Sequence, residues 1–108
     1  MDTLEKIKQQ IAENAIILYM KGSPDMPQCG FSARAAGCIK DCGVAFAFVD
    51  ILANPDIRQT LPQYADWPTF PQLWVSGELI GGSDIIAEMH ANGELEPLLK
   101  QAVQTKQH

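Results

Sequence analysis

The sequence has few of the residues that build disulfide scaffolds, metal clusters or nucleic-acid surfaces. It contains only 3 cysteines, 2 histidines and 8 lysines and arginines among 108 residues. A small and odd number of cysteines excludes a disulfide-stabilised scaffold and favours a reducing compartment, so we expect a cytoplasmic protein. The formal net charge of -5 leaves no broad basic surface for phosphate groups, which argues against nucleic acid as a partner.

Long apolar runs are also absent. No run approaches the ~18 residues of a membrane-spanning helix, and the N-terminal segment lacks the apolar stretch of a signal peptide. Hydrophobic residues nevertheless make up 46% of the chain, which is enough for one folded core but, at this length, too little for two. We therefore expect a single domain over residues 1–108 and no membrane as a partner.

Apolar periodicity predicts five helices along the chain. Asp2 and Glu5 form a capping box for the first helix, and Ser83 is expected to cap the fourth. The third helix should end or kink at Pro62. The expected helices span about residues 3–13, 29–42, 54–65, 83–92 and 94 onward.

Two short apolar runs and one hairpin complete the predicted elements. AIILYM (15–20) is typical of a buried strand, and AFAFVDI (45–51) of a second strand. QLWVSGELIGG (72–82) is typical of two strands that turn at Ser76-Gly77. The order strand, helix, strand, helix, hairpin, helix predicts one α/β domain with a mixed sheet.

Cys29 is the candidate reactive residue, because it follows the proline-rich loop KGSPDMPQ and opens a predicted helix. The free amides and the dipole of a helix N-terminus stabilise a thiolate, and Lys21 adds positive charge nearby, so the pKa of the thiol should be low. A buried apolar cysteine is the alternative, but the preceding loop and Gly30 favour a reactive thiol. Redox motifs of the Cys-x-x-Cys kind have a second cysteine at the position that Ser32 occupies here.

Cys38 and Cys42 are expected in the core, because they share one helical stripe with Phe31 and Ala35. A two-cysteine metal site at this spacing is the alternative, although tetrahedral sites use four ligands. Nine residues of helix separate Cys38 from Cys29 by ~13 Å, beyond the ~7 Å between Cα atoms that a disulfide can bridge. Cys38 should therefore not resolve a disulfide at Cys29.

Three separated motifs carry a resemblance that covers nearly the whole chain: KGSPDMPQCGFS (21–32), NPDIR (54–58) and WPTFPQLWVSGELIGGSD (67–84). Together they resemble the monothiol glutaredoxins of the CGFS type, and in particular the short, single-domain members. The resemblance implies an α/β thioredoxin fold of the glutaredoxin kind, with a small central mixed four-stranded sheet flanked by helices. It also implies glutathione as a ligand and Cys29 as the redox-active thiol.

The resemblance assigns the parts of glutathione to residues of this chain. Lys21 and Arg58 would hold the glycine carboxylate, since a guanidinium matches a carboxylate in shape and charge, with Gln63 in support. Without the motif, Arg58 would be interpreted as part of a solvated helix face. Phe70-Pro71 matches the cis-proline bend of the family, where the backbone pairs with the cysteinyl part of the ligand.

The resemblance places the glutamyl end of the ligand at the start of the fourth predicted helix. The free amides at Ser83 and Asp84 would take its carboxylate and the side chain of Asp84 its ammonium, although Asp84 is also an ordinary first-turn residue. Gly82 lets the chain approach closely; Phe31 and Thr69 complete the implied ligand site. Many family members have a second cysteine at the position of Ser83, so their disulfide with the active-site cysteine is absent here.

The resemblance implies a function in iron–sulfur cluster assembly, storage and transfer. A [2Fe-2S] cluster takes four thiolates; Cys29 would be a ligand shared with the cysteine of a dimeric partner, and two glutathione thiols would complete the set. The implied partners are a second copy of the chain when the cluster is bound, apo iron–sulfur acceptor proteins and BolA-type proteins.

Two alternatives to the carrier function stay open. A glutathione-dependent thiol-disulfide oxidoreductase could use Cys29 as a single nucleophile in deglutathionylation, with a second glutathione to resolve the mixed disulfide. A regulatory adaptor could pair with BolA-type proteins through the same cluster-binding face.

Overall fold

One mixed sheet lies at the centre of the molecule in the computed structural model, which describes residues 1–107 and the side chains of residues 1–105. Its strands are β1 (Ile16–Met20), β2 (Ala47–Asp50), β3 (Gln72–Val75) and β4 (Glu78–Gly81). Their spatial order is β2-β1-β3-β4, with β1 parallel to β2 and the other two pairs antiparallel. The predicted α/β class and mixed four-stranded sheet are confirmed.

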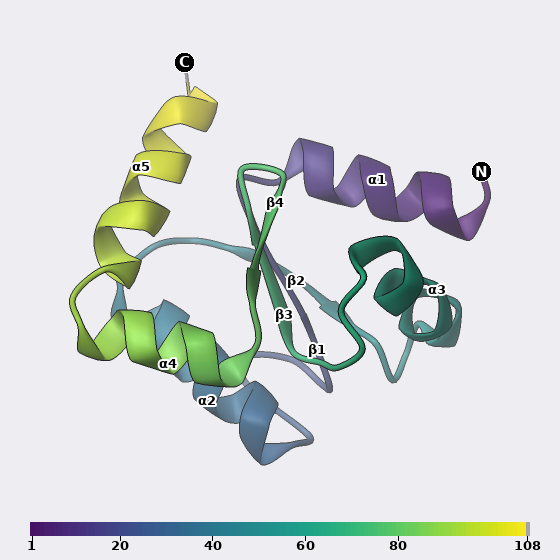
Figure 1. Ribbon diagram of the computed structural model, residues 1–108, viewed down its shortest axis with the longest axis horizontal. Helices are drawn as coiled ribbons and strands as arrows, with labels where there is room; N and C mark the ends of the chain where they lie inside the picture. The colour runs from purple at the N-terminus through teal and green to yellow at the C-terminus, as the bar shows by residue number, and fades with distance from the viewer. Residues whose placement is uncertain (108) are drawn as a thin grey trace.

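Helices cover both faces of this sheet (Figure 1). One face carries α1 (Thr3–Glu13) and α3 (Pro55–Ala65), and the other carries α2 (Gly30–Asp41), α4 (Ser83–Ala91) and α5 (Leu95–Gln107). Within the described residues, none of these helices combines the length and the apolar character needed to cross a bilayer.

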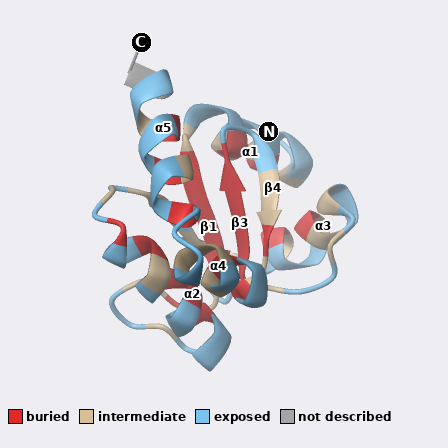
Figure 2. Cartoon of the chain, turned by 60° about the vertical axis from the view of Figure 1, so that its left-hand side comes forward, coloured by how far each residue is buried: buried red, intermediate tan, exposed pale blue. Residues whose placement is uncertain are grey.

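The sheet separates two hydrophobic cores, and β1 contributes to both because its side chains alternate between the faces. Leu18 and Met20 belong to the core under α2, α4 and α5, whereas Ile17 and Tyr19 belong to the core under α1 and α3. Every residue of β1 is buried, as Figure 2 shows for the central strands. This explains why the strand is a continuous apolar run in the sequence.

Local signals predicted α1 and the β3–β4 hairpin correctly. The amide of Glu5 donates to Asp2 Oδ1 at 2.8 Å, which provides the predicted helix cap. Ser76 and Gly77 have φ values of 52° and 83°, so both turn residues take the left-handed conformation that a two-residue hairpin loop requires. The second strand is shorter than expected, since β2 includes only residues 47–50 of the predicted 45–51.

Pro62 does not end α3, which continues for three more residues to Ala65. Ile57 and Leu61 are fully buried on the inner side of the helix, so core packing holds the helical path despite the hydrogen bond that proline cannot donate. The helix ends at Asp66, a non-glycine residue with a left-handed φ of 52°.

Ser83 is not the cap of α4, contrary to the prediction from sequence. Gly82 holds the N-cap position with an extended backbone, and its carbonyl accepts the amide of Ile86 at 3.0 Å. Ser83 is therefore the first residue of the helix, and its hydroxyl oxygen is buried without a hydrogen-bond partner.

Candidate functional site

Strand register brings three segments together at one end of the sheet. Tyr19, near the end of β1, pairs with Gln72 at the start of β3, and Leu73 pairs with Gly81 at the end of β4. The chain after β1, the loop before β3 and the start of α4 therefore meet at this end. These segments contain all but two of the residues that the sequence assigned to the site.

Cys29 occupies the N-cap position of α2, with an extended backbone and a partly exposed thiol. Its pKa lies below the ordinary value, chiefly because the backbone N–H of Ser32 donates to the sulfur. The N–H of Phe31, the charge of Lys21 and the hydroxyl of Ser32 act in the same direction, while desolvation opposes them. The predicted lowering of the pKa at this helix start is confirmed.

Ser32 replaces the second cysteine of a dithiol motif, and here it has a structural contact. Its side chain is fully buried, and its Oγ accepts the backbone N–H of Lys21 at 3.0 Å. The hydroxyl thus ties the end of β1 to the first turn of α2, and it lies close enough to Cys29 to influence the thiol. A cysteine sulfur is a weaker acceptor than a hydroxyl oxygen.

Cys42 lies in the core, as predicted, whereas Cys38 is only partly buried. Cys42 is 4% exposed, Cys38 packs against the same core cluster, and burial raises the pKa of both thiols. Within the described part of the chain, no group of three or more His, Cys, Asp or Glu side chains could hold a metal ion. Phe31, which shares the helical stripe of these two cysteines, does not share their burial, because it is 63% exposed.

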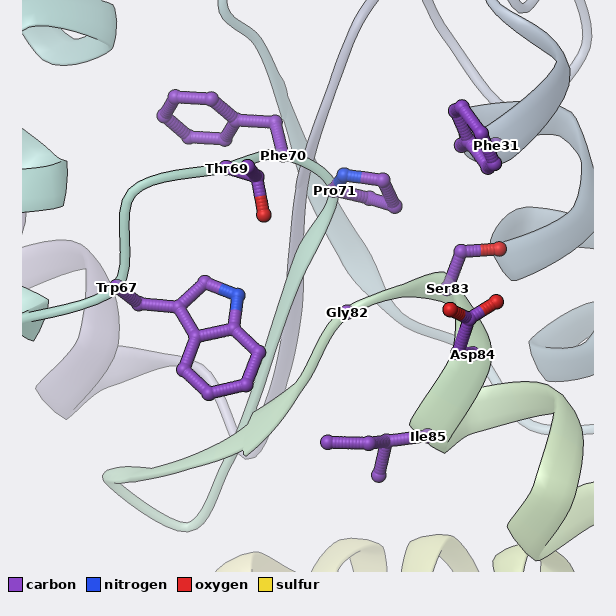
Figure 3. A pocket seen from close by; sticks show the side chains of 9 residues that line it. All are labelled: Phe31, Trp67, Thr69, Phe70, Pro71, Gly82, Ser83, Asp84 and Ile85. Atoms are coloured by element: carbon purple, nitrogen blue, oxygen red, sulfur yellow. The ribbon is translucent and has the colours of Figure 1, made fainter.

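The larger of two adjoining pockets, about 470 Å³, lies between the start of α2, the loop before β3 and the start of α4 (Figure 3). Seven residues that the sequence assigned to the ligand site line it: Phe31, Thr69, Phe70, Pro71, Gly82, Ser83 and Asp84. The Phe70–Pro71 peptide bond is cis, as the resemblance implied.

Trp67 and Ile85 also line this pocket, and sequence reasoning did not select them. Trp67 is the first residue of the motif that contains the predicted ligand residues, so its position there was a usable signal. Ile85 packs on Gly81, whose φ is 147° and where an added Cβ would come within 2.6 Å of the Ile85 side chain. Only glycine is compatible with this close approach of β4 to α4.

A second pocket, about 290 Å³, shares Thr69 and Phe70 with the first and carries the positive charge. Lys21 and Arg58 line it, together with Pro62 and Pro68. An elongated ligand could therefore lie along the Thr69–Phe70 backbone, with one end at the two cations and the other at the start of α4.

The structure does not bring Gln63 to this site: its side chain is exposed and lines neither pocket. Cys29 also lines neither pocket, although Phe31, two residues further along, is part of the larger one. The assignment of a ligand contact to Gln63 therefore stays a prediction without geometric support.

Two polar contacts organise the site. Arg34 Nη1 lies 3.4 Å from Asp84 Oδ1, so an exposed ion pair joins α2 to α4 through Asp84, which lines the larger pocket. The buried amide of Gln72 donates to the carbonyls of Trp67 at 3.0 Å and Thr69 at 3.3 Å, and its oxygen accepts the indole N–H of Trp74 at 3.2 Å. Gln72 thus anchors the loop before β3 to the core.

The fold, a low-pKa thiol at a helix start and a pocket lined by Phe31 and the cis Pro71 define a thiol protein of the thioredoxin-fold class. Residues 16–80 match the family model described as Glutaredoxin. A Legionella pneumophila protein named "Probable monothiol glutaredoxin GrlA" is 77% identical over 87 residues, which cover 81% of this chain and 98% of that protein. The chain therefore belongs to the glutaredoxin family, and its Cys29-Gly30-Phe31-Ser32 motif is that of the monothiol members.

Solved structures agree with this assignment. The solution structure of reduced poplar apo GrxS14 has a TM-score of 0.79 and 39% identity, and the match covers 93% of this chain and 92% of that one. A buckwheat glutaredoxin–glutathione complex has a TM-score of 0.79 at 24% identity, covering 92% of this chain and 88% of that one. At that identity the second likeness concerns the fold alone.

Proposed function

We propose that this monothiol glutaredoxin binds glutathione and carries a [2Fe-2S] cluster bridged between two subunits, for cluster assembly, storage and transfer. The observation that carries the proposal is the isolation of Cys29. Its thiol is partly exposed and has a lowered pKa, whereas burial raises the pKa of Cys42, a core residue, and of Cys38, which is partly buried against the same core. A single reactive thiol beside a ligand pocket suits a function in which the remaining thiols come from outside the chain.

The two adjoining pockets match the charges of glutathione. Lys21 and Arg58 suit the glycine carboxylate, and the backbone before the cis Pro71 suits the cysteinyl part of the tripeptide. The glutamyl end then falls near Gly82, where the free amides at the start of α4 can bind its carboxylate and Asp84 its ammonium. We expect this placement to leave the glutathione thiol facing the start of α2, where Phe31 lines the larger pocket and Cys29 holds the N-cap position.

The donor set of one chain fits half of a cluster site. A [2Fe-2S] cargo takes four thiolates, and Cys29 is the cysteine of this chain that is partly exposed and has a lowered pKa. A second copy would add its own cysteine, and two bound glutathione thiols would complete the set. Because half of these ligands are exchangeable small molecules, we expect the cluster to pass readily to apo acceptor proteins.

A second candidate function is supported by the lowered pKa of Cys29. The thiolate can attack the glutathionyl sulfur of a glutathionylated protein, which forms a mixed disulfide between Cys29 and glutathione and releases the protein thiol. The thiolate of a second glutathione then attacks the same glutathionyl sulfur and releases Cys29 together with glutathione disulfide. A second cysteine in the chain is not needed in either step. Both functions require a reducing compartment such as the cytoplasm.

A regulatory adaptor function is the third candidate, because it would use the same face. In that case a BolA-type partner takes the position of the second copy around the cluster. The carrier and the adaptor differ in the protein that replaces the second copy: an apo acceptor for the carrier and a BolA-type protein for the adaptor.

Anaerobic reconstitution with iron and sulfide, with and without glutathione, tests the main proposal. We expect a [2Fe-2S] absorption spectrum that requires glutathione and that elutes as a dimer on size exclusion. A colourless monomer under both conditions would overturn the carrier function and leave the oxidoreductase as the better proposal. A spectrum that forms without glutathione would mean that the chain supplies the missing ligands itself.

A further inference from the structure

Two polar side-chain atoms in the described residues are buried without a hydrogen-bond partner, and both belong to the same pocket. They are the indole nitrogen of Trp67 and the hydroxyl oxygen of Ser83. Native proteins pair nearly all such atoms, so each exception needs an explanation. Because both residues line the larger pocket, we infer that a bound ligand provides the missing hydrogen-bond partners.

The fold uses the backbone of Trp67 but not its side-chain donor. The N–H of Trp67 donates to Pro62 O at 3.1 Å, and its carbonyl accepts from Gln72 at 3.0 Å, so the residue is held at both ends. The other tryptophan, Trp74, donates its indole N–H to Gln72 at 3.2 Å. The unpaired indole of Trp67 is therefore particular to its place in the pocket wall.

The indole nitrogen of Trp67 is turned toward Gly82 (Figure 3). It would lie 3.7 Å from a Cβ added at Gly82, and the carbonyl oxygen of Pro71 would lie 3.4 Å from the same point. Ser83 projects on the other side of Gly82, toward Phe31. Trp67 and Ser83 thus flank the segment at which the glutamyl end of the ligand is expected.

We propose that Trp67 is a further glutathione-binding residue, whose indole N–H donates to an oxygen of the glutamyl arm. This inference rests on the proposed function. An indole N–H is a donor only, so it needs an acceptor, and the arm carries two kinds: its α-carboxylate and its γ-carbonyl oxygen. The glycine carboxylate is not the partner, because Lys21 and Arg58 draw it to the other pocket.

The nitrogen is shielded from solvent, so the contact requires a rotation of the ring. Trp67 lines the pocket of about 470 Å³, and we expect its ring to turn toward that space when the ligand binds. The rotation exchanges an unpaired buried donor for a hydrogen bond to the ligand, which favours the liganded state.

Nuclear magnetic resonance of the wild-type, reduced chain tests this directly, because the sequence has only 2 tryptophans. Their two indole N–H signals are resolved and assigned, and glutathione is then titrated in. We expect the Trp67 signal to move downfield and the Trp74 signal, already hydrogen-bonded to Gln72, to shift much less and so to serve as the internal reference. An unmoved Trp67 signal while the amides of Gly82 and Ser83 shift would overturn the inference and leave glutathione binding intact.

Affinity measurements with ligand analogues identify the acceptor. Trp67→Phe keeps an aromatic ring but removes the donor, and it should weaken glutathione binding about tenfold. The first analogue, 4-aminobutyryl-cysteinyl-glycine, lacks the glutamyl carboxylate. If that carboxylate is the acceptor, Trp67→Phe and wild type should bind this analogue with equal affinity. If the γ-carbonyl oxygen is the acceptor, the variant should still bind it about tenfold more weakly than wild type. Glutaryl-cysteinyl-glycine lacks only the ammonium, so the variant should bind it more weakly than wild type whichever of the two oxygens is the acceptor.

Two outcomes overturn the inference here. Equal glutathione affinity for Trp67→Phe and wild type would remove Trp67 from the site. If glutathione shifts no resonance of the wild-type chain, the inference fails together with the proposed glutathione site. The wild-type titration keeps the test decisive even if the variant folds poorly.

Discussion

The backbone N–H of Lys21 donates to the buried hydroxyl of Ser32 across a sequence separation of 11 residues, at 3.0 Å. This bond joins the first residue of the KGSPDMPQ loop, directly after β1, to the helix that begins beside Cys29. The residue in place of a second cysteine is therefore part of the scaffold that holds the reactive thiol.

Ser32→Ala should destabilise the chain and raise the pKa of Cys29. The substitution leaves the Lys21 N–H without its acceptor, which typically costs about 1–3 kcal/mol for a buried group. It also removes a hydroxyl that lowers the pKa of the thiol. Urea denaturation measures the first effect, and the pH dependence of Cys29 alkylation by iodoacetamide measures the second.

Ser23→Ala is the matched control for Ser32→Ala. Ser23 Oγ also accepts a backbone N–H, that of Met26 at 3.1 Å, but this bond is exposed to solvent. The control should lose much less stability and leave the pKa of Cys29 unchanged. Equal effects for the two variants would contradict the structural role of Ser32.

The lowered pKa of Cys29 predicts a specific pH dependence of stability. In the unfolded chain the thiol has its ordinary pKa of about 8.5, so between the folded and unfolded values the unfolded state binds more protons. The contribution of Cys29 is thus fully present above the unfolded pKa and is lost as the pH falls through the folded one. Wild type should therefore gain stability over Cys29→Ser as the pH rises through this window, as measured by urea midpoints. A constant difference would show that the thiolate is not stabilised.

Cysteine substitutions should separate the surface thiol from the core thiols. Cys29→Ser should abolish cluster binding and leave the fold intact. Cys38→Ala with Cys42→Ala should keep the cluster, although the cavities in the core reduce stability by about 1–2 kcal/mol. Absorbance after anaerobic reconstitution and thermal denaturation provide the two measurements. A folded double variant that loses the cluster would overturn the assignment of Cys38 and Cys42 to the core alone.

The sequence predicted those features that depend on residues close together in the chain. The cap at Asp2, the turn at Ser76-Gly77 and the position of Cys29 at a helix start follow from local patterns of residue type. Helical periodicity alone predicted that Cys38 and Cys42 pack toward the core.

Features that depend on contacts between distant segments were missed. The sequence left open whether α3 ends or kinks at Pro62, and the helix continues because Ile57 and Leu61 are anchored in a core that no local pattern describes. Arg34 and Asp84 form their ion pair across 50 residues, and Phe31 is exposed although it shares the stripe of buried residues. The motif quoted for the family contained Trp67, but only the assembled pocket gives its indole an unpaired donor.

Arg58→Glu should weaken glutathione binding, because it reverses one of the two positive charges in the second pocket. Lys100→Glu is the matched control, since Lys100 pairs with Glu96 on α5 and lines neither pocket of the site. Isothermal titration with glutathione measures both variants. Equal affinities would remove Arg58 from the site, and a salt-independent loss would argue against a charge effect.

Gln72 should control the shape of the ligand site from a position within the core. It is fully buried, and Gln72→Met leaves the carbonyls of Trp67 and Thr69 and the indole of Trp74 without their partner. We expect a loss of about 2–3 kcal/mol in the free energy of unfolding together with weaker glutathione binding, because the loop that both pockets share loses its anchor.

Gln72→Glu distinguishes the anchor from general core packing. The carboxylate keeps the volume of the side chain and an acceptor for Trp74, but it cannot donate to the two loop carbonyls. If Gln72 acts on the loop, Gln72→Glu should impair glutathione binding as Gln72→Met does, and the amide resonances of residues 66–71 should shift in both variants. Wild-type affinity in a folded Gln72→Glu chain would show that the loop keeps its ligand-binding shape without this anchor.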